Sequence, residues 1–226
     1  MNEKIILALD LSTKEEVEKT ILKFREKIKW VKVGMELFYS QGPDIVHYLK
    51  DQDFSIFLDL KLHDIPNTVG QALKNLCKLP IDMINLHTLG GSKMMSEASA
   101  VVKDSLYSPY LIGVTQLTST DEQAFIELGF RGSLVDNVAH LAQLAHQNHL
   151  DGVVCSAHEV PIIKNICGAD FLCVTPGIRL LGSSSDDQKR IMTPDNALKL
   201  GSDFLVMGRT LINNPQLIDQ IPGETL

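Results

Sequence analysis

The sequence predicts a single closed (β/α)8 barrel, the TIM-barrel architecture, formed by residues 1–226 as one domain. Eight short apolar runs of strand length recur about every 28 residues, and each leads through a turn into a helix or loop. No Pro-, Gly- or Ser-rich linker divides the chain, and right-handed crossovers favour closure into one barrel. A doubly wound open sheet is the alternative. It would normally carry a Gly-rich fingerprint after the first strand, where this chain has Asp10-Leu11-Ser12.

The elements are expected in strict alternation. The strands are predicted over residues 5–10, 30–34, 54–61, 83–87, 110–116, 152–156, 171–175 and 203–207. Helices are predicted over residues 12–28, 43–51, 66–78, 94–103, 121–128 and 134–149. Ser12 with Glu15 three residues later forms a capping box for the first helix, and Pro66 suits the first turn of the third.

Charge and composition exclude several classes of protein. A net charge of −7 argues against general affinity for nucleic acid, so a site for an anionic ligand must be locally basic. The five apolar residues 5–9 are too few for a signal peptide, and no run approaches the ~20 residues of a membrane span. Cys155 and Cys173 lie in apolar runs and are expected to be buried free thiols. We therefore expect a cytoplasmic protein with no membrane or nucleic-acid partner.

The third predicted strand carries charge on one face only. In residues 55–64, SIFLDLKLHD, four aliphatic side chains alternate with Phe57, Asp59, Lys61 and His63. Asp64 follows where the strand should end. Because burying an unpaired charge costs several kcal/mol or more, Asp59 and Lys61 must be solvated, paired or functional.

The first two strands are expected to add charges at the same place. Lys32 lies opposite Val31 and Val33, so it enters the barrel lumen if those apolar residues face the helices. Asp10 lies at the end of its strand, at the rim. Active sites of these barrels lie at the carboxyl ends of the strands. The sequence therefore predicts an alternating array of Asp10, Lys32, Asp59 and Lys61 that is typical of catalytic sites.

A phosphate site is expected after the seventh and eighth strands. Residues 175–179 end the seventh strand, and Gly208 and Arg209 follow the eighth. A glycine lets backbone N–H groups approach a phosphate, and an arginine offers a bidentate donor. The Gly- and Ser-rich residues 181–190 are either a solvated connector or a lid over the site. These features indicate a phosphorylated small molecule as the ligand.

Residues 59–68 contain the pattern Asp59-x-Lys61-x-x-Asp64-Ile65-Pro66-Asn67-Thr68. This segment resembles the signature of the orotidine 5'-phosphate decarboxylase family in its bacterial form. The likeness continues in the correct order over nearly the whole chain, through residues 8–10, 31–34, 117–119, 151–156, 175–179, 187–194 and 208–209.

The resemblance implies decarboxylation of orotidine 5'-monophosphate to UMP and CO2, the last step of de novo pyrimidine synthesis, with no metal or organic cofactor. It implies that Lys61 protonates C6 of the pyrimidine and that Lys32, Asp59 and Asp64 complete its charge network. The substrate-binding residues it implies are Asp10, Lys32, Asp59, Ile65, Thr68, Thr118, Ser119, Pro176, Arg179, Gln188, Gly208 and Arg209. It also implies a homodimer, in which Asp64, Ile65 and Thr68 complete the neighbouring subunit's site.

Two other functions compete with this interpretation. A related metal-dependent sugar-phosphate decarboxylase or aldolase also carries an Asp-x-Lys-x-x-Asp segment, but typically has an acidic residue where Lys32 stands. A lysine there argues against a dication, since like charges would meet. A non-catalytic nucleotide-binding protein would need the phosphate site but not Lys32, Asp59, Lys61 and Asp64.

Overall fold

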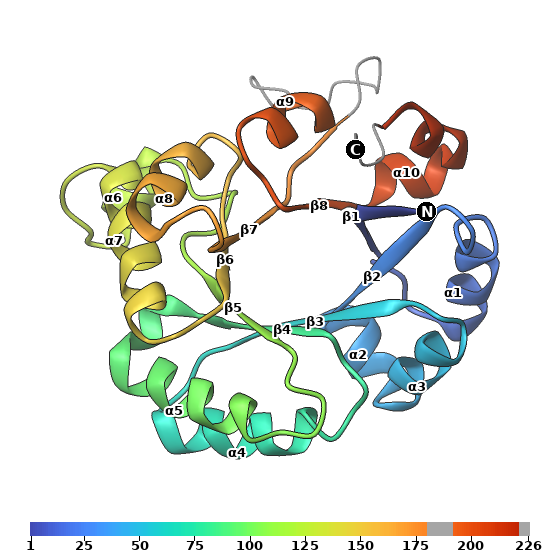
Figure 1. The fold of residues 1–226 in the computed structure, drawn as a ribbon, viewed down its shortest axis with the longest axis horizontal. Coiled ribbons are helices and arrows are strands. Elements are labelled where there is room, and N and C mark those ends of the chain that lie inside the picture. The colour runs from blue at the N-terminus through green and yellow to red at the C-terminus, as the bar shows by residue number, and fades with distance from the viewer. Residues whose placement is uncertain (180–191, 222–226) are drawn as a thin grey trace.

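Eight parallel strands close into a barrel in which each strand pairs with the next along the chain and β8 returns to pair with β1 (Figure 1). The computed structural model describes residues 1–179 and 192–221. The strands are β1 (Asn2–Ala8), β2 (Ile28–Gly34), β3 (Ser55–Leu62), β4 (Met83–His87), β5 (Tyr110–Val114), β6 (Gly152–Val154), β7 (Leu172–Thr175) and β8 (Phe204–Met207). The predicted (β/α)8 barrel is confirmed.

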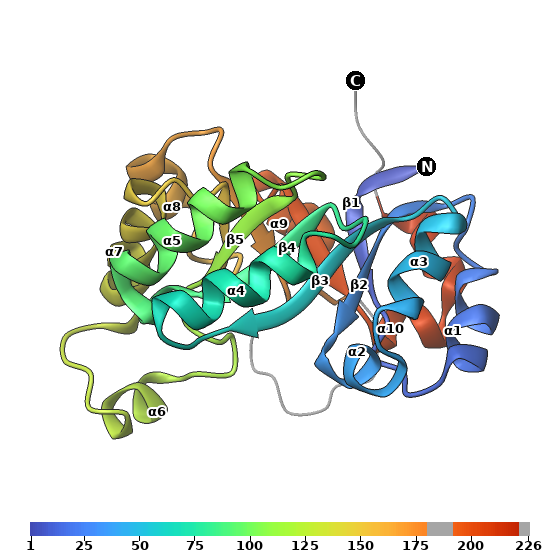
Figure 2. The same ribbon diagram turned by 90° about the horizontal axis from the view of Figure 1, so that it is seen from below.

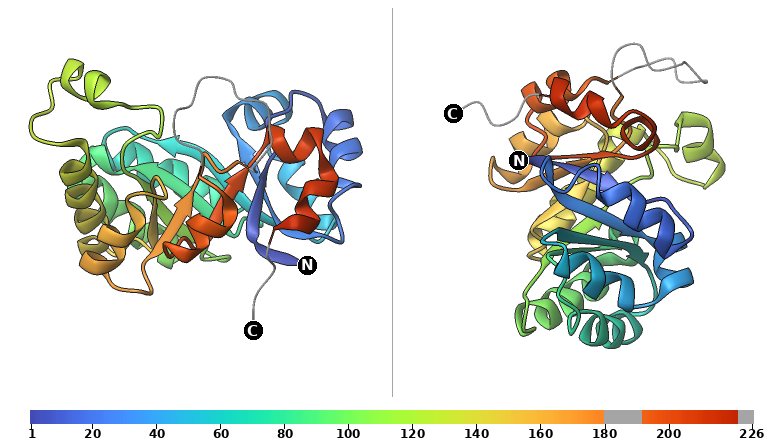
Figure 3. Two further views of the ribbon diagram at one scale, coloured as in Figure 1. Left: turned by 90° about the horizontal axis from the view of Figure 1, so that it is seen from above. Right: turned by 90° about the vertical axis from the view of Figure 1, so that its right-hand side faces the viewer.

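Helices surround the ring of strands on its outside (Figure 1). They are α1 (Lys14–Ile21), α2 (Met35–Gln41), α3 (Asp44–Asp51), α4 (Pro66–Leu76), α5 (Gly91–Lys103), α6 (Glu122–Glu127), α7 (Leu134–Gln147), α8 (Val160–Cys167), α9 (Pro194–Lys199) and α10 (Arg209–Asn213), with short 3-10 helices at η1 (Thr88–Gly90) and η2 (Pro215–Gln220). The α6 helix stands clear of the ring (Figures 2 and 3). Within the described residues no helix is both long and apolar enough to cross a membrane.

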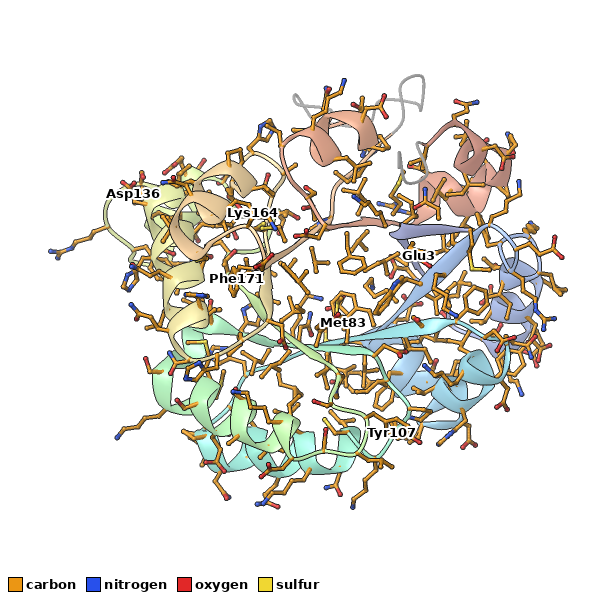
Figure 4. All side chains as sticks on the ribbon, viewed as in Figure 1. Glu3, Met83, Tyr107, Asp136, Lys164 and Phe171 are labelled. Atoms are coloured by element: carbon orange, nitrogen blue, oxygen red, sulfur yellow. The ribbon has the colours of Figure 1, made fainter. Side chains whose placement is uncertain are left out.

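The alternation of side chains along the strands separates two apolar cores. Ile6, Trp30, Phe57, Met83, Ile112 and Val174 pack against one another inside the barrel. Met83 is labelled within the ring of strands in Figure 4. The intervening residues, such as Val31, Val33, Ile56 and Leu58, belong to the larger core between strands and helices. The lumen is therefore filled by apolar side chains below the level of the charged residues. All four cysteines are buried and free, as predicted for Cys155 and Cys173.

The first helix differs from its prediction at both ends. Thr13, not Ser12, is its N-cap, because Thr13 accepts from the Glu16 amide while the Glu16 side chain accepts from the Thr13 amide. The helix ends at Ile21, since the following amides of residues 23 and 24 donate to carbonyls only three residues back. Strand β2 consequently begins two residues earlier than predicted, at the buried Ile28.

Three aspartates fasten the barrel at the amino ends of its strands. Asp82, Asp151 and Asp203 each stand immediately before an even-numbered strand. Each carboxylate accepts a hydrogen bond from the backbone amide of the second residue of the preceding strand, from Ile56 at 2.8 Å and from Leu111 and Cys173 at 2.7 Å. In return, the backbone amide of each aspartate donates at 3.0 Å to the backbone carbonyl of the strand residue whose amide its carboxylate binds. A charge-assisted hydrogen bond of this kind contributes roughly 1.5–3 kcal/mol, so this end stabilises the barrel away from the strands' carboxyl ends.

Candidate active site

Four charged side chains, from β2, β3 and the segment just after β1, meet at the carboxyl ends of the strands. The Lys32 ammonium lies 3.2 Å from Asp10 Oδ1 and 3.2 Å from Asp59 Oδ2. The Lys61 ammonium lies 2.6 Å from Asp59 Oδ1. The side chains of Lys32 and Asp59 are 11% and 10% exposed, whereas that of Asp10 is 52% exposed at the rim. The structure thus brings together the four residues of the predicted array, with signs alternating along it.

The environment of Asp59 keeps its carboxyl group ionised. Burial alone would raise its pKa, but the ammonium groups of Lys32 and Lys61 lower it. Hydrogen bonds from Lys61 and Asn85 act in the same direction, and the pKa lies below its ordinary value. Asp59 therefore carries a negative charge at neutral pH, opposite in sign to the two ammonium groups beside it.

Strand β3 departs from regular geometry at Lys61. The pairing of β3 with β4 is regular through Leu58 and resumes at Leu62, with an irregularity between them. Lys61 has a φ of 51°, in the left-handed region that a residue with a side chain rarely adopts. Strained backbone of this kind is concentrated at functional sites. Lys61 thus combines a left-handed backbone near the end of β3 with an ammonium group paired with Asp59.

The residue opposite this irregularity is Asn85 on β4, which the sequence analysis did not single out. It is fully buried, its Nδ2 donates to Asp59 Oδ1 at 2.7 Å, and its Oδ1 accepts from the Lys61 amide at 2.8 Å. One signal was available. An asparagine inside the apolar run 83–87 must find hydrogen-bond partners when buried.

A cavity of about 240 Å³ opens above the array. Its lining residues come from the ends of β2, β3, β5, β6 and β8 and from the segments after β5 and β7: Lys32, Phe57, Asp59, Lys61, Val114, Gln116, Leu117, Thr118, Ser119, Val154, Pro176 and Val206. The predicted Thr118, Ser119 and Pro176 therefore share one cavity with Lys32 and Lys61. Five apolar side chains and Gln116 were not predicted. The cavity combines an apolar wall with a charged one, as small-molecule sites do.

Two glycines keep space open beside the charged groups. A Cβ on Gly34 would lie 3.0 Å from Lys32 Nζ, and one on Gly208 would lie 3.5 Å from Asp10 Oδ2. A methyl group at Gly34 would therefore press on the Lys32 ammonium, whereas one at Gly208 would press on the Ala8 side chain at 3.3 Å and meet Asp10 only at ordinary contact distance. Gly208 was predicted as a phosphate ligand and lies at the start of α10, beside the rim, whereas Gly34 was not predicted.

Other predicted residues lie outside this cluster. Asp64, Ile65 and Thr68 are exposed beyond the end of β3, and Asp64 Oδ1 accepts from the Ile65 amide at 2.7 Å. In the described part of the chain, Lys61 pairs with Asp59, and these three residues make no hydrogen bond or ion pair with it. Arg209 is exposed at the start of α10, and Arg179 is half-buried after β7. Gln188 and the rest of residues 181–190, expected to form either a connector or a lid, lie outside the described residues.

No metal site accompanies the array in residues 1–179 and 192–221, where no three His, Cys, Asp or Glu side chains are grouped so as to hold an ion. Lys32 occupies the space between Asp10 and Asp59. A dication there would meet an ammonium at short range.

His87, at the end of β4, is a half-buried residue next to the array. Its ring centroid lies 5.5 Å from that of His63, and its Nδ1 is buried with no hydrogen-bond partner in the described part of the chain. Burial, with His63 and Lys61 nearby, lowers the pKa of His87 against an opposing effect of Asp59. The imidazole is therefore neutral at neutral pH.

This lowered pKa predicts a pH dependence of stability. Between about pH 6.5 and the lower folded pKa, the unfolded chain binds a proton that the folded chain does not, so the free energy of unfolding falls as pH falls. His87→Gln is expected to make this fall shallower in urea denaturation between pH 5 and 7. His140→Gln, at an exposed position of α7, is the matched control. Identical slopes for His87→Gln and the wild type would refute the prediction.

Several known proteins resemble this chain over almost its whole length. The profile of the Orotidine 5'-phosphate decarboxylase / HUMPS family matches residues 3–218. Orotidine 5'-phosphate decarboxylase of Streptococcus suis is 53% identical over 209 residues, 91% of this chain and 89% of the relative. The protein of that name from Carboxydothermus hydrogenoformans is 47% identical over 216 residues, 94% and 90% of the two chains.

A solved structure extends the likeness to the fold. The crystal structure of orotidine 5'-phosphate decarboxylase from Lactobacillus acidophilus superposes with a TM-score of 0.83 at 36% identity, covering 97% of this chain and 98% of that one. Sequence and structure agree over almost the full length of both molecules. The chain belongs to the Orotidine 5'-phosphate decarboxylase / HUMPS family.

Proposed function

We propose that this chain decarboxylates orotidine 5'-monophosphate to UMP and CO2, the last step of de novo pyrimidine synthesis. The observation that carries the proposal is the array Asp10–Lys32–Asp59–Lys61, which ends on an ammonium at the cavity wall. The names of the relatives support the same reaction. The reaction belongs in the cytoplasm, where pyrimidine nucleotides are made, and it needs neither metal nor organic cofactor.

The array suits the chemistry of this decarboxylation. The bond between C6 and the carboxylate breaks, its electron pair stays on C6, and CO2 leaves. The vinylic carbanion has no nearby carbonyl to delocalise it well, so fixed charges must stabilise it. The Lys61 ammonium, held by Asp59, stabilises this charge and then gives its proton to C6 to form UMP. Solvent returns a proton to the Lys61 amine.

The remaining predicted residues are assigned to the rest of the substrate. Asp10 and Lys32 bind the ribose hydroxyls, and Thr118, Ser119 and Pro176 lie against the base or its surroundings. The phosphate ligands are Gln188, Gly208 and Arg209, with Arg179 supporting the phosphate end. Binding energy at the distant phosphate then organises the reacting end of the nucleotide.

The working unit is a homodimer in this proposal. Asp64, Ile65 and Thr68 project from the end of β3 and complete the neighbouring subunit's site. Exposed apolar side chains on three successive segments support an interface there, since Ile65, Leu89 and Leu117 follow β3, β4 and β5 and are 66%, 41% and 44% exposed. Asp64 of one subunit then joins Asp59 beside the Lys61 of the other.

A chelator experiment tests the reaction against its rivals. We expect the wild-type chain to consume orotidine 5'-monophosphate, followed by loss of its ultraviolet absorbance, at the same rate with and without EDTA. The physical reason is that Lys32 supplies the positive charge between the two carboxylates that a dication would otherwise supply. Keto-sugar phosphates should give no product. Activity that depends on added Mg²⁺, or saturable UMP binding without decarboxylation, would overturn the proposal.

A further inference from the structure

Asn85 joins the two groups on which the proposed proton transfer depends. It is fully buried on β4, two residues after Met83 of the lumen core. Its Nδ2 donates to the same Asp59 oxygen, Oδ1, that the Lys61 ammonium contacts at 2.6 Å. Its Oδ1 accepts from the Lys61 backbone amide. One side chain therefore holds both the carboxylate partner of the ammonium and the backbone from which the ammonium projects.

The Lys61 amide needs this partner because the strand ladder is interrupted there. Between Leu58 and Leu62, β3 advances four residues while β4 advances two, from Ile84 to Leu86. Asn85 is the β4 residue opposite the interruption. The left-handed backbone of Lys61 persists only where its surroundings over-determine it, and the amide bond to Asn85 Oδ1 is a contact that does so.

We propose that Asn85 is a positioning residue for this site, which fixes the Lys61 ammonium and the Asp59 carboxylate relative to each other. The inference rests on the proposed function, since it assigns Lys61 as the proton donor. Only a side-chain amide offers an N–H to a carboxylate and an oxygen to a backbone N–H at once. An aspartate at this position would place two carboxylates in contact, and an aliphatic residue would leave Asp59 Oδ1 and the Lys61 amide each short of one partner.

The substitution Asn85→Asp should make kcat depend on pH, because it replaces the amide donor with a group that can lose its proton. Two carboxylates in contact share one proton, and while that proton is bound an O–H can replace the missing N–H donor to Asp59. We expect kcat of the variant to be highest at low pH and to fall about tenfold per pH unit above the pKa of the pair, a step that the wild type lacks. A variant profile parallel to that of the wild type would overturn the proposal.

The contact between residue 85 and Asp59 can also be tested without substrate, through the melting temperature of the variant. The shared proton is bound more tightly in the folded Asn85→Asp chain than in the unfolded chain, so its stabilising effect is present at low pH and lost as pH rises through the pKa of the pair. We expect the melting temperature of the variant, relative to the wild type, to fall between pH 5 and 8. A constant difference would show that Asn85 and Asp59 are not coupled and would overturn the proposal.

Asn85→Ala separates positioning from stability. We expect kcat to fall by about 10²-fold with KM changed less than about threefold, because a small displacement of the donor costs turnover more than binding. Thr88→Val is the matched control, since it removes a fully buried hydroxyl that donates to the Val114 carbonyl at 2.8 Å beyond the same strand. It should lose stability and keep kcat. Equal kcat in the two variants would contradict the proposal.

Failure of the inference and failure of the proposed function are distinguishable. Suppose that the wild type decarboxylates the nucleotide, but that neither kcat nor the melting temperature of Asn85→Asp shows the expected dependence on pH. The positioning role is then wrong and the function stands. If the wild type does not decarboxylate the nucleotide, the function is wrong and the role for that reaction falls with it. The melting profile then still decides whether Asn85 couples to Asp59.

Discussion

Replacing Lys61 with alanine is expected to lower turnover of orotidine 5'-monophosphate by on the order of 10⁴-fold or more, because one change removes both the electrostatic stabilisation of the C6 anion and its proton source. Single-turnover absorbance measurements at saturating nucleotide isolate this effect from binding. KM should change far less than kcat, since the phosphate ligands are untouched.

The fold of this variant should survive. Asp59 keeps its ion pair with Lys32 at 3.2 Å and its hydrogen bond from Asn85, and the Lys61 side chain is 27% exposed, so water can enter. Lys61→Gly should be as inactive as Lys61→Ala but more stable, because glycine adopts a φ of 51° without strain. Far-ultraviolet circular dichroism and thermal melts check both statements.

Lys50→Ala is the matched control for the loss of a lysine. Lys50 pairs with Asp82 at 2.8 Å at the amino end of the same strand, away from the cavity. This variant should lose some stability and keep wild-type kcat. Near-normal turnover by Lys61→Ala would refute the assignment of the proton donor. An equal loss in Lys50→Ala would show that the assay reports stability rather than chemistry.

Mixing two inactive variants, Lys61→Ala and Asp64→Ala, is expected to restore activity to about a quarter of the wild-type value. In the proposed dimer each site takes Lys61 from one subunit and Asp64 from the other. A mixed dimer then has one doubly altered site and one intact site. If subunits exchange at random, about half of the dimers are mixed, so about a quarter of all sites are intact.

The matched control mixes Lys61→Ala with Lys32→Ala. These two lysines belong to one array within a single subunit, 3.2 Å and 2.6 Å from the same Asp59. No mixed dimer of this pair contains an intact site, so no activity should return. Unfolding and refolding the mixture promotes exchange, and light scattering follows the dimer. Absence of restoration with Asp64→Ala, despite confirmed exchange, would contradict a shared site.

The position of the array was predictable because strand alternation is a strong constraint. Val31 and Val33 must be buried against helices, which sends Lys32 into the lumen, and the same argument places Asp59. The parallel sheet then brings the strand ends together, so Asp10 joins them. These predictions used only the alternation of side chains between the two faces of a strand and the order of the strands in the sheet.

The details at Lys61 were beyond this reasoning. Strict alternation gives the correct face for Lys61, but no pattern in the residues signals its left-handed backbone or the interrupted pairing with β4. Asn85 was overlooked because a single polar residue in an apolar run does not reveal which partners satisfy it. The choice between Ser12 and Thr13 as N-cap also depended on one residue of register, since each has a glutamate three positions later.

The three aspartates at the amino ends of the strands bear on how such a barrel can change over evolution. Asp82, Asp151 and Asp203 bind neighbouring strands into pairs at the end opposite the cavity. Substitutions at the cavity end of the barrel therefore leave these hydrogen bonds untouched. A lineage can exchange rim residues and explore new substrates while the lower half of the barrel keeps the chain folded. Stability and substrate choice then depend on different sets of residues, one at each end of the barrel.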